Sequence, residues 1–341
     1  MSSRARKRTT AAAAIAIGGL LLLLAAPGMG ESSVSCAYVE AGAPGAAGNV
    51  LRIEDGTNTV THIYREGEDI IVFNNASDRV PCTGDAATIF NTDRIEYVST
   101  NGVPFFGYIG NEALTPGATP EPSGSEIEIV VQESFPAEVL NVAGTSGSET
   151  IVAGQLGRRR LGVNLNAQAD GAKQDADVIL DDVDPSWAFV RVAGRGGADR
   201  LSALGGPGFS GSLLVDRLQF SGGPGDDLLA GGPGSDLLSG GDGDDVMRSG
   251  RGRDHISVGP GSDLVKAGKG ADRVENHSDV GGTPPDLGPD RVFTGAGNDY
   301  VNLERSPRGN LLRCGTGRRD SAVVNLDDRV AECERVEVTR R

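Results

Sequence analysis

Short runs of aliphatic and β-branched residues alternate with polar turns along most of the chain. Residues 49–53, 59–64 and 69–73 are examples, and each lies between Gly, Asn or Asp residues. Alternation with a period of two, interrupted by turn-forming residues, predicts short β-strands. We see no helical periodicity after residue 30, so the pattern predicts an all-β fold.

From residue 222 the pattern becomes strictly periodic, with a unit of nine residues. Six consecutive units span residues 222 to 275, with the sequences GGPGDDLLA, GGPGSDLLS, GGDGDDVMR, SGRGRDHIS, VGPGSDLVK and AGKGADRVE. Glycine occupies the second and fourth positions of each unit, and an aliphatic residue or Met occupies the eighth. The glycines of the first three units are Gly223, Gly225, Gly232, Gly234, Gly241 and Gly243.

Aspartate occupies the sixth position of every unit. After a nine-residue interruption, units at 285–293 and 294–302 restore the pattern, and isolated degenerate units lie earlier at 144–152 and 194–202. The sixth-position residues are Asp227, Asp236, Asp245, Asp254, Asp263 and Asp272, and Asp299 follows the interruption.

The repeat predicts a parallel β-roll, or β-solenoid. Fixed glycines permit turns with positive φ, and three following residues make a short strand whose middle, eighth-position side chain points inward. Two units make one coil, so Asp227, Asp245 and Asp263 are expected on one edge of the roll. Asp236, Asp254 and Asp272 are expected on the other edge.

Carboxylates stacked about 4.8 Å apart repel one another unless a cation lies between the coils. Carboxylate and carbonyl oxygens in a flexible turn suit Ca²⁺, whereas Mg²⁺ demands a tighter octahedron and keeps its water. The sequence therefore predicts calcium sites at these aspartates and at the turn glycines named above. Two other interpretations, a disordered linker and a metal-free solenoid, explain the in-phase apolar residue and the aspartate ladder less well.

These units resemble the hemolysin-type, or repeats-in-toxin (RTX), calcium-binding family, whose unit is G-G-x-G-x-D-x-U-x. The resemblance covers residues 222 to 302 and implies that sixth-position aspartates and turn carbonyls hold Ca²⁺. Units four to six depart from it at position 1, with Ser249, Val258 and Ala267, and carry basic residues beside their turns. We therefore expect weaker sites from the fourth unit onward.

The chain divides by composition into five segments. The first, 1–30, has a basic start and an apolar run of about 16 residues, short of the ~20 that cross a bilayer, and predicts a secretory signal peptide rather than a membrane anchor. We expect no transmembrane segment after its removal. The other segments are a β-rich region (31–135), degenerate solenoid coils (136–221), the calcium-binding β-roll (222–302) and a disulfide-closed C-terminal cap (303–341).

Four cysteines fall into two distant pairs, Cys36 with Cys82 and Cys314 with Cys333. In an oxidising compartment this arrangement suggests two local disulfides. A zinc site made from all four would need closely spaced pairs such as C-x-x-C, which the sequence lacks.

The net charge of −15 disfavours nucleic acid as a partner and favours cations. The sequence contains neither an H-E-x-x-H nor a G-x-S-x-G motif, so we assign no catalytic residue and expect no enzymatic activity. Asp181, Asp182 and Asp184 could form a further cation site or a solvated acidic loop. Overall, a secreted, extracellular calcium-binding protein is predicted, structural or adhesive, with cell-surface or matrix components as candidate partners. The alternative is a secreted hydrolase or toxin with its catalytic part in residues 36–200.

Overall fold

The structure is a computed structural model of the full chain. It describes residues 34–40, 49–56, 61–66, 69–74, 78–85, 87, 92, 94–99, 106–110, 128–132, 139–165, 176–184, 188–206, 208–215, 217–276, 288–306 and 309–339. The predicted signal peptide and most of the interruption after the sixth unit lie outside these ranges.

The described residues form two large β-sheets and no helix. We call the 16-stranded sheet sheet A and the 13-stranded sheet sheet B. Sheet A contains β1 (Val34–Val39), β2 (Val50–Asp55), β6 (Cys82–Thr83), β7 (Arg94–Ser99), β9 (Glu128–Gln132), β11 (Thr150–Gly157), β12 (Arg160–Asn164), β13 (Val178–Asp181), β15 (Arg200–Ser202), β16 (Gly211–Ser212), β18 (Leu228–Ala230), β20 (Val246–Arg251), β22 (Leu264–Lys269), β24 (Arg291–Ala296), β26 (Leu311–Arg313) and β28 (Arg329–Ala331). Sheet B contains β3 (Thr61–Glu66), β4 (Asp69–Asn74), β5 (Asp78–Arg79), β8 (Phe106–Gly110), β10 (Val139–Ala143), β14 (Phe189–Ala193), β17 (Arg217–Pro224), β19 (Ser235–Asp242), β21 (His255–Ser257), β23 (Arg273–Glu275), β25 (Tyr300–Asn302), β27 (Ser321–Asn325) and β29 (Arg335–Thr339).

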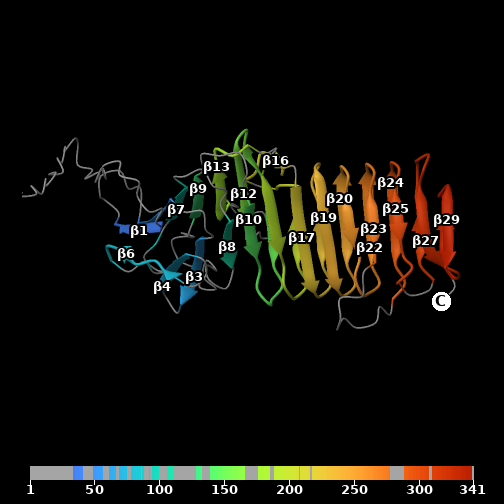
Figure 1. The fold of residues 1–341 in the computed structure, drawn as a ribbon, viewed down its shortest axis with the longest axis horizontal. Coiled ribbons are helices and arrows are strands. Elements are labelled where there is room, and N and C mark those ends of the chain that lie inside the picture. Colours follow the sequence, from blue (N-terminus) through green and yellow to red (C-terminus); the bar gives the residue numbers. More distant parts are fainter. Residues whose placement is uncertain are drawn as a thin grey trace, which may run out of the picture.

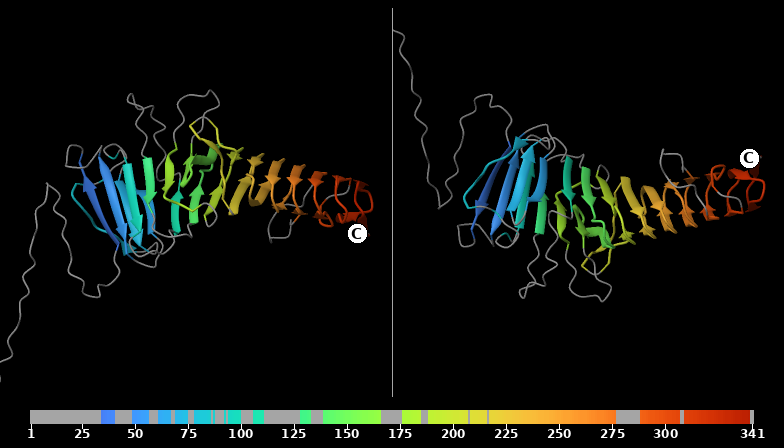
Figure 2. Two further views of the ribbon diagram at one scale, coloured as in Figure 1. Left: turned by 90° about the horizontal axis from the view of Figure 1, so that it is seen from above. Right: turned by 90° about the horizontal axis from the view of Figure 1, so that it is seen from below.

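Successive strands of the repeat region alternate between the two sheets and pair in parallel with the strand one coil away. In sheet A, Leu228 of β18 pairs with Val246 of β20, and Val246 pairs with Leu264 of β22. Figure 1 shows these strands stacked along the long axis of an elongated molecule, and Figure 2 shows the two layers from above and below. The parallel β-roll predicted from the repeat is therefore confirmed.

Columns of small aliphatic side chains fill the space between the two layers. The eighth-position residues of the six units are completely buried, as the phase of the repeat predicts: Leu229, Leu238, Met247, Ile256, Val265 and Val274. Some strands add a second buried side chain at the next first position, as Ala267 does after Val265 in β22. This geometry explains how a chain with 4% aromatic residues builds a continuous core.

The β-rich region before residue 135 joins the same two sheets as the repeats. In sheet A, β9 pairs in parallel with β13, and in sheet B, β8 pairs in parallel with β10. Antiparallel pairs occur in this region, as in β1–β2 and β3–β4, and again around β11 and β12. The compositional boundary near residue 135 is thus crossed by continuous hydrogen-bonded sheets.

One feature of the degenerate coils differs from a simple parallel stack. Strand β11 turns back through residues 158–159 and pairs antiparallel with β12, which pairs antiparallel with β13. A two-residue connection between adjacent strands makes a tight hairpin, so an extra strand is inserted into sheet A here.

Two disulfides tie the ends of the roll. Cys36 is bonded to Cys82, joining β1 to β6, and Cys314 is bonded to Cys333 just after β26 and β28. Both pairings agree with the prediction. At the C-terminal end the sheets continue to β28 and β29, where Val336 and Val338 are exposed. Among the described residues, no helix is long and apolar enough to cross a membrane.

Candidate metal centre

The turns between the sheets stack along two edges of the roll. On the first edge the chain passes from sheet B to sheet A, and this edge carries Asp227, Asp245 and Asp263. On the second edge the chain passes from sheet A to sheet B, and this edge carries Asp236, Asp254 and Asp272. The structure thus separates the aspartates into the two predicted sets.

On the first edge a ladder of hydrogen bonds connects each sixth-position residue to the next coil. The backbone N–H of Asp227 donates to Oδ1 of Asp245 at 2.8 Å, and that of Asp245 donates to Oδ1 of Asp263 at 2.8 Å. The N–H of Asp263 donates to Oδ1 of Asp290 across the interruption, at 3.2 Å. The inserted residues therefore leave the phase of the ladder intact.

The second edge carries an equivalent ladder. The N–H of Asp236 donates to Oδ1 of Asp254 at 2.9 Å, and the N–H of Asp254 donates to Oδ1 of Asp272 at 3.0 Å. The N–H of Asp272 donates to Oδ1 of Asp299 at 2.9 Å. All seven predicted metal-binding aspartates thus lie in one of the two ladders, each at most 3% exposed.

Both ladders extend beyond the units from which the sites were predicted. On the first edge, Glu149 and Asp199 precede the repeats, and the N–H of Asp199 donates to Oδ1 of Asp227 at 2.7 Å. On the second edge, the N–H of Asp299 donates to Oδ1 of Asp320 at 2.9 Å. The missed positions had a signal in the sequence, since residues 194–202 keep an aspartate at their sixth place.

The second carboxylate oxygen has no such partner at most ladder positions. Oδ2 is buried and accepts no hydrogen bond in Asp199, Asp227, Asp245, Asp272 and Asp320, whereas the hydroxyls of Ser249 and Thr294 lie beside the carboxylates of Asp254 and Asp299. A buried polar atom without a partner costs about 1–3 kcal/mol, and more when the group is charged. The ladders therefore hold a row of oxygen atoms that a cation would satisfy.

At glycine-led turns this oxygen lies against the main chain of the first-position glycine, together with a carbonyl oxygen of the next coil, and we call this arrangement the cradle. A Cβ atom placed on Gly240 would overlap Oδ2 of Asp245 and the carbonyl oxygen of Val258 in the next coil. The same pair of oxygens, from the aspartate and from the next turn, surrounds the missing Cβ at Gly194 and Gly222. The first position is glycine in these turns because a side chain would occupy the cradle.

Later turns fill this space with a side chain of their own. Val258, Ser249 and Ala267 stand at the first position and are completely buried. The hydroxyl of Ser249 donates to the carbonyl oxygen of Ala267 at 2.7 Å. This difference gives a physical reason for the expectation of weaker sites from the fourth unit onward.

The glycines at the second and fourth positions of the unit determine the backbone conformation of the turn. Gly241 and Gly243 have φ angles of 122° and 134°, where a side chain is strained, and both pack against carbonyl oxygens of the preceding coil. Gly223 and Gly225 adopt the same conformation, but Gly232 and Gly234 do not have positive φ.

The exceptional turn is the first nonapeptide turn on its edge. Asp236 pairs in register with Leu218, so no aspartate precedes it, and the N–H of Gly232 donates to its Oδ2 at 2.7 Å. The structure therefore places Gly232, Gly234 and Asp236 in an arrangement different from the other predicted sites.

Burial raises the pKa of the ladder carboxyls far above the usual value. The pKa reaches about 6 for Asp227, about 7 for Asp199, Asp236 and Asp272, and about 8 for Asp245. Removal from water is the largest cause, and backbone hydrogen bonds oppose it. Without a cation, these groups would therefore take up protons at a higher pH than exposed carboxyls do.

A hard cation fits this donor set better than a transition metal. Among the described residues, no three His, Cys, Asp or Glu side chains form a metal-binding group, so a centre would rely on carbonyl oxygens beside each carboxylate. Ca²⁺ accepts six to eight such oxygens at about 2.3–2.6 Å in variable geometry. When bound, it would supply the positive charge that the buried Oδ2 atoms lack, held by Asp227 or Asp245 with the turn carbonyls.

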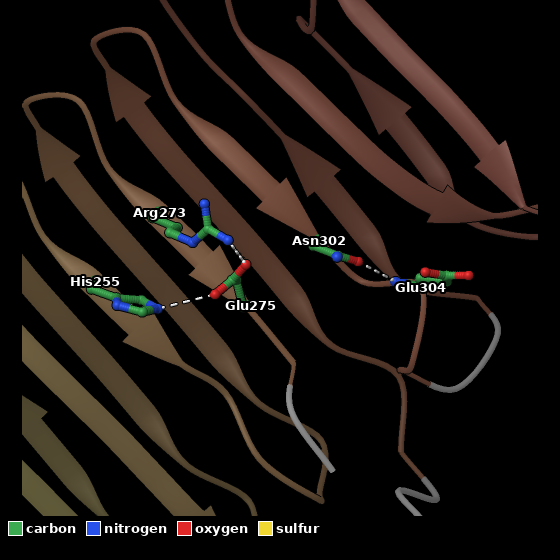
Figure 3. Close-up of polar contacts among 5 residues, drawn as sticks. All are labelled: His255, Arg273, Glu275, Asn302 and Glu304. Atoms are coloured by element: carbon green, nitrogen blue, oxygen red, sulfur yellow. Dashed lines mark hydrogen bonds and ion pairs between the residues drawn. The ribbon is translucent and has the colours of Figure 1, made fainter. Parts of the chain in front are cut away.

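Other acidic residues are already engaged elsewhere. Asp182 pairs with Arg159 at 2.7 Å, and Asp181 lies 3.9 Å from Arg160, so ion pairs with arginines account for part of this acidic loop. On sheet B, Glu275 lies between Arg273 and His255 (Figure 3). Oε2 of Glu275 is 3.1 Å from Nε2 of His255. These groups stand apart from the ladders.

Comparison with known proteins agrees with this geometry. A family model for the RTX calcium-binding nonapeptide repeat, in four copies, matches residues 221–256, 250–277 and 286–305. A search of the curated proteins and a search of the solved structures each found no match. The resemblance stated from the repeat sequence is confirmed for this segment, and so is Ca²⁺ as its cation.

The cradle generates a prediction about its first-position residue. Gly240→Ala should place a methyl group between Oδ2 of Asp245 and the Val258 carbonyl, and weaken Ca²⁺ binding there at least about tenfold, or ~1.4 kcal/mol. Isothermal titration calorimetry of metal-free protein measures this. The reverse change, Ala267→Gly, opens a cradle and should strengthen binding at its turn. Unchanged stoichiometry and affinity in both variants would contradict the assignment.

The raised pKa values predict how the metal-free roll responds to pH. The folded carboxyls bind protons more tightly than the unfolded ones, so their contribution is fully present below about pH 4 and is lost as the pH rises to about 8. Metal-free protein should therefore melt at a higher temperature at pH 5 than at pH 8. Excess Ca²⁺ should remove or reverse this difference. A metal-free melting temperature that rises from pH 5 to pH 8 would count against buried, protonated ladders.

Proposed function

We propose, on the premise that residues 221–305 carry RTX calcium-binding repeats, that the chain is an exported, non-catalytic protein whose roll folds as it binds Ca²⁺. The observation that carries the proposal is the row of buried Oδ2 atoms without partners, repeated in consecutive coils. Each leaves a charge or a proton in the core when no cation is bound. The folded roll is therefore the form that Ca²⁺ selects.

The size of the effect follows from mass action. A ligand that binds only the folded state stabilises it by ~2.7 kcal/mol per site at a hundredfold excess over Kd. Domains have total stabilities of only ~5–15 kcal/mol, so occupation of two or three cradles would decide whether the roll is folded. Glycine-led cradles at Gly194, Gly222 and Gly240 provide this number on the first edge.

Two observations support a role outside the cell. The two disulfides are typical of oxidising compartments, and the N-terminal pattern predicts an export signal. Calcium modules that work extracellularly have Kd values of about 10⁻⁴–10⁻³ M, matched to a calcium-rich medium. Export into such a medium would convert a loose chain into a rigid rod, which suits a structural or adhesive protein.

Absence of catalysis is part of the proposal and rests on the missing motifs. Screening the protein against ester, peptide, phosphate and glycoside substrates tests it. Turnover abolished by one acidic substitution within residues 36–200 would favour the secreted hydrolase or toxin instead.

The folding proposal is tested by far-UV circular dichroism of residues 31–341, freed of metal and titrated with Ca²⁺ or Mg²⁺. We expect a cooperative gain of β signal with Ca²⁺ and little with Mg²⁺. Asp245→Asn should shift the midpoint to higher Ca²⁺, whereas Asp244→Asn, at an exposed neighbour, should shift it far less. A metal-free spectrum that is already fully folded, and indifferent to Ca²⁺, would overturn the proposal.

A further inference from the structure

Positive charge gathers on one face of this acidic protein. The segments 246–253, 264–271, 291–298 and 311–319 contain nine Lys or Arg residues and no Asp or Glu. Each segment is a strand of sheet A followed by its turn on the second edge. We call the outer side of β20, β22, β24, β26 and β28, with these turns, the cationic face.

The strand cations of the cationic face form two neighbouring columns. In one column Arg248, Lys266, Phe293 and Arg313 lie in register, and in the other Leu264, Arg291, Leu311 and Arg329 do. All the Lys and Arg side chains in these columns are exposed. Basic side chains are therefore interspersed with apolar side chains on the outer surface of sheet A.

The turn cations continue this surface over the second edge. Arg251 lies directly opposite Lys269 in the parallel ladder. The backbone N–H of Arg253 donates to Ser235, and that of Arg318 to Asn298, which places both in the stacked turns beside the strands. Arg319 follows, and all five side chains are exposed.

These cations are not neutralised within the described part of the chain, apart from Arg313, which pairs with Glu332 at 2.5 Å. On sheet B, by contrast, Arg273 forms an ion pair with Glu275. Like charges directly opposite on neighbouring strands are destabilising, and Arg248–Lys266 and Arg251–Lys269 are two such pairs in the same two strands. A bound polyanion would remove that repulsion.

We propose that the cationic face binds an acidic polysaccharide, a chain carrying carboxylate or sulfate groups at regular intervals. Strands about 4.8 Å apart present cations at a spacing close to the length of one sugar unit. Phe293 and Leu311, between the basic residues, offer apolar surface to the C–H faces of sugar rings. Exposed guanidinium groups can also bind carboxylate or sulfate through paired hydrogen bonds.

Nucleic acid fits the same face less well. Single strands are held by several aromatic side chains that stack with successive bases, whereas the two columns carry one aromatic residue, Phe293. The proposal rests on the proposed function in one respect, since the face exists only when the roll is folded. Folding is therefore measured in the same samples as binding.

The test is surface plasmon resonance of calcium-loaded protein over immobilised polygalacturonate, with uncharged dextran as reference. We expect binding that weakens as NaCl is raised, and Arg248→Glu combined with Lys266→Glu should weaken it at least about tenfold. The matched control, Arg217→Glu with Arg335→Glu on sheet B, makes the same charge change and should weaken it less than about threefold.

Every other result of this experiment contradicts a single claim. Protein that folds with Ca²⁺ by circular dichroism but binds polygalacturonate no better than dextran overturns the inference and leaves the proposed function standing. Equal loss in both double variants would overturn the assignment to the cationic face. Tighter binding to single-stranded DNA than to polygalacturonate would overturn the polysaccharide class. Failure to fold with Ca²⁺ would instead contradict the proposed function.

Discussion

The roll depends on one repeated interaction, the buried carboxylate that joins each coil to the coil before it. Oδ1 accepts the backbone N–H of the previous sixth-position residue, which fixes the stacking distance and the phase of the turns. At several ladder positions, including Asp227 and Asp245, Oδ2 then lies in the interior without a hydrogen-bond partner. The same side chain thus specifies the stacking of the coils and leaves a carboxylate oxygen that a cation would satisfy, which is the basis of the proposal that folding and calcium binding are coupled.

The two edges of the roll differ in the residues that surround the buried carboxylates. On the first edge, glycine-led cradles coincide with the exposed acids Asp226 and Asp244, so negative charge surrounds the open sites. On the second edge, side chains such as Ala267 occupy the cradle and basic residues occupy the turns. The two edges therefore differ in charge, because exposed acidic residues lie on the first edge and basic residues lie on the second. In the two proposals above, the first edge supplies most of the calcium sites and the second edge supplies part of the surface for a partner.

Much of this architecture could be predicted from the sequence because the nonapeptide fixes both strand length and inward side chain. The phase of Leu238 and Ile256, and the division of the aspartates between two edges, follow directly from counting by nine. The ladder positions Asp199 and Asp320 were harder to predict because their units are irregular: Arg195 replaces the second-position glycine before Asp199, and one extra residue separates Gly317 from Asp320. Packing against a neighbouring coil, not local sequence, keeps these positions in line.

Three other features depend on contacts that a linear pattern does not reveal. The hairpin between β11 and β12 inserts an antiparallel strand, and the sequence of that strand does not differ in pattern from the strands of the parallel coils. The turn at Gly232 and Gly234 keeps the repeat sequence but lacks an aspartate in the coil before it, so its glycines adopt another conformation. The cationic face arises because residues 18 or more positions apart are brought into register.

The most direct test of the central claim is to locate calcium in crystals of the calcium-loaded protein by anomalous scattering. The account predicts peaks beside Oδ2 of Asp199, Asp227 and Asp245, next to the first-position glycines, and weaker or absent peaks where Val258 and Ala267 fill the cradle. Peaks of equal height at the filled and open turns would show that the first-position residue does not control binding. No peak along either ladder at saturating Ca²⁺ would contradict the claim that the buried carboxylates hold the metal.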